Sequence, residues 1–167
     1  MCNMLKTGNV VEEMINYYSS DSRRIQHFLK VYGFAKAIGE VENLPAQLQE
    51  ILEVAAVVHD IGIKVSEEKY QSSAGEYQQL EGPPIAKAML EKLGYEETFI
   101  DRVCYLIAHH HTYKNIDGLD YQILVEADFM VNISEDEMKP DMIQSIKEKI
   151  FATKTGLEFL TRIYQKS

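Results

Sequence analysis

The stretch I-L-E-V-A-A-V-V-H-D-I-G, residues 51–62, ends in a glycine preceded by an adjacent histidine and aspartate, His59 and Asp60. The residues before this pair are apolar on nearly every side of the helix they predict, which is typical of a buried helix. Burying an imidazole and a carboxylate is costly unless something pairs with them. A metal ion could pair with both, and the alternative is a satisfied core histidine beside a helix-terminal aspartate. Taken alone, the pair favours the interpretation without a metal, a satisfied core histidine beside a helix-terminal aspartate.

Helical periodicity dominates the rest of the chain, and strand-type alternation is hard to find. We therefore expect an all-α fold of about seven or eight helices. The polar, serine-rich stretch 63–75 predicts a loop with at most a turn of helix. The expected helices span about residues 10–18, 20–40, 45–60, 82–93, 97–111, 120–132, 140–151 and 155–164.

Capping residues set several of these expected helix ends. They are Asn9 with Glu12 as a capping box, Ser20 or Asp21, Pro45 and Asp120 at helix starts, and Gly94 at a helix end.

The composition indicates one globular domain over residues 1–167, with the last two helices, 140–164, as packing elements. Of the 167 residues, 46% are hydrophobic and 26% are charged, a balance typical of soluble proteins. No apolar run approaches the roughly 20 residues of a membrane span, and the first ten residues lack the apolar segment of a signal peptide. Cys2 and Cys104 form no disulfide framework, so we expect a reducing cytoplasm.

The net charge of −9, from 17 basic and 26 acidic residues, narrows the class of partner. It argues against a nucleic-acid polymer, because binding a phosphate backbone needs a basic face. It also opposes a small phosphorylated substrate, unless two divalent cations supply a local charge of about +4. The sequence carries no signal for or against a homo-oligomer.

His27 shares an apolar helical row with Val31 and Ile38. Arg23 and Arg24 lie one turn earlier and could reach whatever His27 binds. For this region alone, a core histidine with two solvated arginines is the better interpretation.

The helix expected to end in His109, His110 and His111 distinguishes these histidines by their position. His110 continues the apolar row of Leu106, and His111 continues the row of Ile107. His109 falls on the polar side, so we expect His110 and His111 to face the core and His109 to face outward.

Asp128 stands among apolar residues in Y-Q-I-L-V-E-A-D-F-M-V-N, residues 121–132, with Asn132 one turn further on. A core-facing aspartate is unusual unless it is paired. Glu81 lies at the expected entrance of the helix over 82–93, where it is either a partner of the helix dipole or a metal ligand. Lys64, just after the His59–Asp60 pair, either contacts an anionic substrate or is solvated.

Four core-facing histidines and two core carboxylates on separate helices would be an expensive set of buried polar groups. Convergence on a metal site explains them together. Mixed imidazole and carboxylate ligands suit Mn, Fe, Co, Ni or Zn, with Mg also compatible. The lack of a thiolate signature argues against a structural zinc site.

This pattern resembles the HD-domain superfamily of metal-dependent phosphohydrolases, whose arrangement is H…HD…D. Here it corresponds to His27, the adjacent His59 and Asp60, and Asp128, over residues 23–133. The segments A-A-V-V-H-D-I-G and E-A-D-F are the most similar stretches. The resemblance implies a compact helical domain around a buried metal held by these four residues.

The resemblance also implies a second metal in many members, held by further histidines. His110 and His111 match the later ones, but Q-Q-L-E-G-P, residues 78–83, lacks the histidine usual after the HD pair. Glu81 would have to substitute for it. One or two divalent ions per chain are therefore both compatible with the sequence.

The function implied by the resemblance is metal-dependent hydrolysis of a phosphomonoester, phosphodiester or phosphoanhydride of a nucleotide or other small metabolite. Asp60 would contact both ions and act in catalysis. Lys64, Arg23 and Arg24 would stabilise the developing charge, with Asn132 also at the substrate. The alternatives are a non-catalytic nucleotide or metal sensor and an HD-type di-iron oxygenase.

Overall fold

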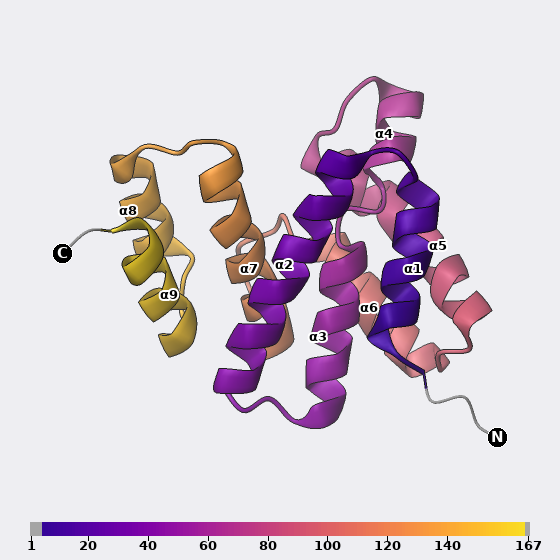
Figure 1. Ribbon diagram of the computed structural model, residues 1–167, viewed down its shortest axis with the longest axis horizontal. Coiled ribbons are helices and arrows are strands. Elements are labelled where there is room, and N and C mark those ends of the chain that lie inside the picture. Colours follow the sequence, from indigo (N-terminus) through magenta and orange to yellow (C-terminus); the bar gives the residue numbers. More distant parts are fainter. Residues whose placement is uncertain (1–4, 166–167) are drawn as a thin grey trace.

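The structure, a computed structural model, describes residues 5–165. This range holds nine α-helices and no strand, which confirms the all-α class (Figure 1). The helices are α1 (Thr7–Tyr18), α2 (Ser22–Val41), α3 (Ala46–Val58), α4 (Ile63–Tyr70), α5 (Gly75–Leu93), α6 (Glu97–His109), α7 (Leu119–Glu135), α8 (Pro140–Lys149) and α9 (Lys154–Tyr164). Within the described range, no helix has the length and apolar character needed to cross a membrane.

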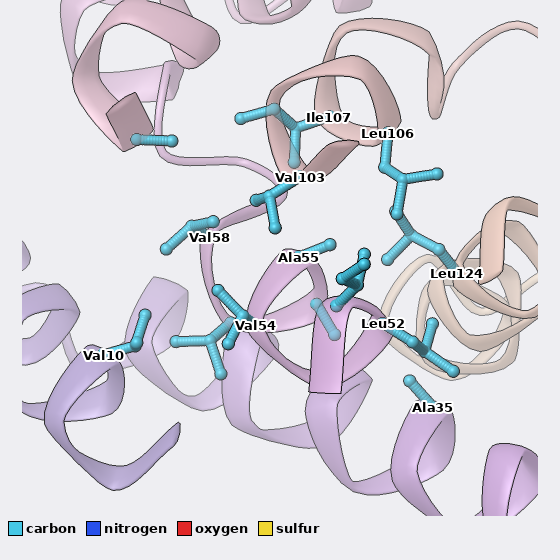
Figure 2. Close-up of a cluster of buried hydrophobic side chains, with 14 of the residues drawn as sticks. Val10, Ala35, Leu52, Val54, Ala55, Val58, Val103, Leu106, Ile107 and Leu124 are labelled. Atoms are coloured by element: carbon cyan, nitrogen blue, oxygen red, sulfur yellow. The ribbon is translucent and has the colours of Figure 1, made fainter. Parts of the chain in front are cut away.

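Helix α3 lies at the centre of the fold, in contact with α1, α2, α6 and α7 (Figures 1 and 2). Every residue from Ile51 to Val58 is buried, as the apolar pattern predicts. Glu53 is the polar exception in this stretch, and its carboxylate accepts hydrogen bonds from Tyr32 Oη at 3.3 Å and Gln49 Nε2 at 3.0 Å. Because other helices surround α3, His59 and Asp60 at its C-terminal end lie in the interior of the protein.

Two expectations about the segment after α3 are wrong. Residues 63–70 form helix α4 instead of a loop, and the hydroxyl of buried Ser66 donates to Gly62 O at 2.7 Å. Helix α5 begins at Gly75, well before Pro83 and Pro84, which lie inside it. Short polar helices and internal prolines both run against local propensity, so tertiary packing decides here.

Gly62 permits a close backbone approach that helps to place α5. A Cβ atom at this position would lie 2.6 Å from the backbone nitrogen of Gly82, a distance that no side chain tolerates. The glycine therefore lets the turn after the His59–Asp60 pair touch α5 directly.

The capping expectations are partly correct. The carboxylate of Asp21 accepts from Arg24 N at 3.3 Å and caps α2, and Gly94 ends α5 in the left-handed conformation. Asn9 is not a cap, because α1 already begins at Thr7. Asp120 is not a cap either, because α7 begins at Leu119 and the fully buried carboxylate of Asp120 accepts two hydrogen bonds from Arg102, both at 2.8 Å.

Helices α8 and α9 pack beside α7 around a second, smaller apolar cluster. Glu126 of α7 connects the segment before α9 to the main body. Its fully buried carboxylate accepts hydrogen bonds from Thr153 Oγ1 at 2.7 Å, Thr153 N at 3.1 Å and Ala152 N at 3.3 Å. It also accepts from Gln122 Nε2 at 2.7 Å. Gly156 is needed beside it, since a Cβ there would lie 1.8 Å from Glu126 Oε1.

Replacing Glu126 with alanine is expected to destabilise the protein by about 3 kcal/mol, because several buried donors lose their acceptor. In a chain of this length, that lowers the melting temperature by about 6 to 12 °C. Thermal unfolding followed by circular dichroism measures the change. Exposed Glu158 on α9 provides the matched control, and equal melting temperatures for Glu126→Ala and Glu158→Ala would contradict the assigned role.

Candidate metal centre

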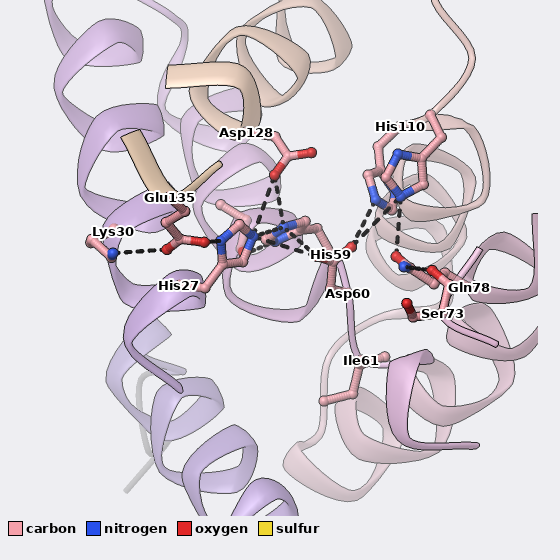
Figure 3. A network of polar contacts seen from close by, with 12 residues as sticks. His27, Lys30, His59, Asp60, Ile61, Ser73, Gln78, His110, Asp128 and Glu135 are labelled. Atoms are coloured by element: carbon pink, nitrogen blue, oxygen red, sulfur yellow. Dashed lines mark hydrogen bonds and ion pairs between the residues drawn. The ribbon is translucent and has the colours of Figure 1, made fainter. Parts of the chain in front are cut away.

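The structure brings four predicted ligands together from three places in the fold: His27 on α2, His59 and Asp60 after α3, and Asp128 on α7 (Figure 3). One donor atom from each lies within 4.8 Å of the others. We call these residues the four-residue group. All are at most 9% exposed.

Hydrogen bonds on the far side of each ring orient the two imidazoles. His59 Nδ1 donates to Ala56 O at 2.7 Å, and His27 Nδ1 lies 2.9 Å from Glu135 Oε2. Each Nε2 therefore points into the group, where the two Nε2 atoms are 3.2 Å apart. A histidine that donates through one nitrogen to a carbonyl or carboxylate is typical of metal ligation through the other.

The spacing of the donor atoms fits a divalent ion. Metal–nitrogen bonds of about 2.0 to 2.1 Å place neighbouring ligand atoms about 3.0 to 3.4 Å apart, depending on the coordination geometry. Each histidine Nε2 lies 3.4 Å from Asp128 Oδ1, and the distances to Asp60 Oδ2 are 3.4 Å from His27 and 3.2 Å from His59. Asp128 Oδ1 is buried and makes no hydrogen bond within the described chain. A shared cation would satisfy this oxygen.

Protons compete with a metal for this group. Burial lowers the pKa of His27, but the carboxylates of Asp128 and Asp60 raise it more strongly, to about 9. The same two carboxylates hold the pKa of His59 well above its usual range despite its burial. Binding a metal through both Nε2 atoms therefore releases protons, so metal affinity falls as the pH is lowered.

Glu135 and Lys30 form an outer layer that the sequence did not reveal. Glu135 Oε2 contacts His27, and Glu135 Oε1 accepts from Lys30 Nζ at 2.8 Å (Figure 3). The available signal was spacing: Glu135 follows Asp128 by two helical turns, and Lys30 follows His27 by about one. The carboxylate fixes the ring of His27 with Nε2 toward the group.

Glu135→Gln is expected to weaken metal binding by about 10-fold to 100-fold, because the neutral amide fixes and polarises the His27 ring less well. Competitive titration against a chromogenic chelator measures the affinity. Exposed Glu137→Gln, two residues further on, is the control and should bind as the wild type does. Identical metal affinities in the two variants would contradict the role of Glu135 in orienting His27.

A second group joins the first through Asp60. Asp60 Oδ1 lies 3.0 Å from His110 Nε2 and 3.8 Å from His111 Nε2, while Oδ2 faces the four-residue group. Burial raises the pKa of Asp60, but His59, His110 and His27 together hold it well below its usual range. Asp60 thus presents a charged oxygen to each group, as expected for a carboxylate between two cation positions. His109 belongs to neither group, and its Nδ1 donates to Tyr105 O at 2.7 Å.

Glu81 lies outside both groups, so the structure does not bring it together with the other predicted ligands. Its carboxylate accepts from Lys69 Nζ at 3.0 Å and Tyr70 Oη at 2.8 Å. It is not a helix-dipole partner either, because α5 begins at Gly75 and places Glu81 in the helix interior.

Buried Gln78 stands beside the second group, and its Oε1 lies 3.1 Å from His111 Nε2. Sequence reasoning missed this glutamine, which carries no chemical signature of its own. Burial and the neighbouring His110 lower the pKa of His111 to about 4, so this ring is neutral near pH 7.

A cleft of about 610 Å³ opens over Asp60 and Asp128. Arg23, Arg24 and Asn132 line it, and their role in substrate binding stays a prediction. Arg24 is already paired with two carboxylates, Asp21 at 3.1 Å and Glu67 at 2.5 Å. Exposed Arg23 makes no ion pair with any described residue and remains available to an anion.

Lys64 does not line the cleft, and its expected role in catalysis and substrate binding stays a prediction. Its Nζ lies over the ring of Tyr17 on α1, 5.2 Å from the ring centroid. The first turn of α4 points the side chain toward α1, and the favourable cation–aromatic contact holds it there.

Comparison with known proteins agrees with this geometry. The family model of the HD domain matches residues 24–152, and the chain belongs to the HD domain family. A solved structure from an uncultured Thermotogales bacterium, described as a predicted HD superfamily hydrolase, has a TM-score of 0.64 at 21% identity. The alignment covers 95% of this chain and 83% of the other, so the two share a fold. No curated protein matches the sequence significantly.

Proposed function

We propose that this protein is a metal-dependent phosphohydrolase that acts on a phosphomonoester, phosphodiester or phosphoanhydride of a nucleotide or other small metabolite. The convergence of two imidazoles and two carboxylates, with Asp128 Oδ1 buried and without a hydrogen bond, carries the proposal. His27, His59, Asp60 and Asp128 would hold a divalent ion. Their mixed nitrogen and oxygen donors suit Fe, Mn, Co, Ni or Zn.

The charge of the cleft explains why the reaction would need a cation. Five carboxylates line it, Asp21, Asp60, Asp128, Glu135 and Asp136, against Arg23, Arg24 and protonated His27, and His27 loses its charge when it binds a metal. A phosphate would be repelled from such a lining without added positive charge. When bound, the ion would supply that charge and lower the pKa of a water molecule so that it can attack phosphorus.

Residues of the chain would bind the substrate and position the attacking water. The Arg23 guanidinium is placed to bind non-bridging phosphate oxygens at the cleft, where an arginine fork matches phosphate geometry. Asn132 offers a neutral donor to the substrate from the same wall. Asp60 Oδ1 faces the second group and, because its pKa stays well below the usual range, it would remain charged and orient the attacking water by accepting a hydrogen bond.

The test is release of inorganic phosphate from a panel of phosphomonoesters, phosphodiesters and nucleotides, after removal of metal and reconstitution with each candidate ion. The proposal expects turnover that a chelator abolishes and that continues without O₂. Tight nucleotide binding without product would instead indicate a sensor. Strict dependence on iron and O₂ would indicate an oxygenase. Either result would contradict the proposal.

A further inference from the structure

One histidine of the second group, His111, uses its ring nitrogens differently from the other histidines. In the four-residue group, His59 donates through Nδ1 to a backbone carbonyl and directs Nε2 inward. His110 does the same, since its Nδ1 donates to Ile107 O at 2.7 Å and its Nε2 faces Asp60. His111 differs, because its Nε2 is the nitrogen that contacts Gln78.

The direction of the His111 hydrogen bond follows from the orientation of the Gln78 amide. Gln78 Nε2 donates to the backbone oxygen of Ser73 (Figure 3). Oε1 is therefore the atom that faces His111. The reverse orientation would bring two oxygens together at Ser73. An amide oxygen only accepts, so the His111 nitrogen that faces it, Nε2, is the one that carries a proton. A protonated nitrogen cannot bind a metal.

The ring of His111 is also fixed in place by α5. A Cβ at Gly75 would lie 2.9 Å from His111 Cδ2, so the imidazole packs directly on this glycine. Gln79 Oε1 accepts from the backbone nitrogen of His111 at 3.1 Å. These contacts of its backbone and its ring with α5 favour the observed orientation of His111, with Nε2 toward Gln78.

We propose that Gln78 withholds His111 from the second group, so that the protein holds one ion tightly in the four-residue group and a second only weakly. Asp60 and His110 alone remain to bind the second ion, and two protein ligands make a poor site. The proposal rests on the metal site of the proposed function, but not on turnover. Gln78 thus sets the number of resident ions.

The test is a titration of the metal-free protein with Mn²⁺, in which calorimetry measures the affinity for each ion and electron paramagnetic resonance detects the bound ions. In the wild type, a second ion should bind roughly 100-fold more weakly than the first. Gln78→Leu removes the acceptor that keeps His111 Nε2 protonated, and should reduce the ratio between the first and second Mn²⁺ affinities by roughly 10-fold. Gln78→His adds a ligand as well, and should show a spin-coupled Mn²⁺ pair. Exposed Gln47→His, a histidine added elsewhere, should match the wild type.

Equal affinity for two Mn²⁺ ions in the wild type would overturn the proposal. An unchanged ratio between the two affinities in both Gln78 variants would also overturn it. Binding of no Mn²⁺ at any concentration would instead remove the metal site of the proposed function, and this inference with it. Binding of one tight ion without turnover on any substrate would leave the inference standing while the hydrolase fails.

A second measurement needs no variant. Nitrogen-15 spectra of the imidazoles in the metal-free wild type should show His111 protonated on Nε2 and unprotonated on Nδ1 near pH 7. The opposite tautomer would overturn the proposal even if the variants failed to fold.

Discussion

Replacing Asp60 with asparagine is expected to lower turnover by about 1000-fold or more, which corresponds to about 4 kcal/mol in the activation barrier. The variant keeps the size of the side chain but loses the charge that faces both groups: Oδ2 toward His27 and His59, and Oδ1 toward His110. Phosphate release from the best substrate of the panel measures the loss.

The control for this variant is Asp101→Asn on the exposed face of α6, which should retain full activity. Circular dichroism should show the same helical content in both variants, because Asp60 lies after α3 and caps no helix. Full activity in Asp60→Asn would contradict the mechanism.

Addition of the preferred metal is expected to raise the melting temperature of the metal-free protein by about 8 to 16 °C. Ligand at 1,000 times its dissociation constant stabilises the folded state by about 4 kcal/mol, and each kcal/mol shifts the melting temperature by about 2 to 4 °C at this chain length. The site joins α2, α3 and α7 through buried side chains, so it exists only in the folded protein.

The variant Asp128→Asn should lose most of this metal-induced shift, because it removes the negative charge of a buried carboxylate whose Oδ1 has no hydrogen bond and would bind the cation. Exposed Asp141→Asn on α8 should keep the whole shift. Differential scanning fluorimetry with and without chelator compares the three proteins. A shift of the same size in all three would place the metal elsewhere.

The sequence predicted the four-residue group because local patterns determine each member. His59 and Asp60 end a helix that is apolar on every side, and such a helix must be central. His27 and Asp128 lie on apolar rows at helical spacing, so each faces the core once its helix forms. Four polar residues directed at one core then lie close together.

The errors arose where a side chain's direction depends on tertiary packing. Pro83 and Pro84 suggested a helix start, whereas α5 begins at Gly75 and packs along α6, which turns Glu81 toward Lys69 and Tyr70. Lys64 was expected at the substrate because it follows Asp60 closely, but α4 carries it to Tyr17.

The partners of Glu135 and Gln78 could not be predicted for a related reason, although helical spacing places Glu135 on the same face as Asp128. Glu135 reaches His27 across the interface between α2 and α7, a separation of 108 residues. Gln78 reaches His111 only because Gly62 and Gly75 allow α5 to approach closely. Neither pair shows a periodic signal, since the pairing depends on how whole helices pack together.

The measurement that tests the central claim most directly is the metal content of wild-type protein and of Asp128→Asn, purified without chelators and analysed by plasma mass spectrometry. The four-residue group predicts about one divalent ion per wild-type chain and nearly none in the variant. Equal metal in both proteins, or no metal in the wild type under any supplementation, would contradict the claim that these residues form a metal centre.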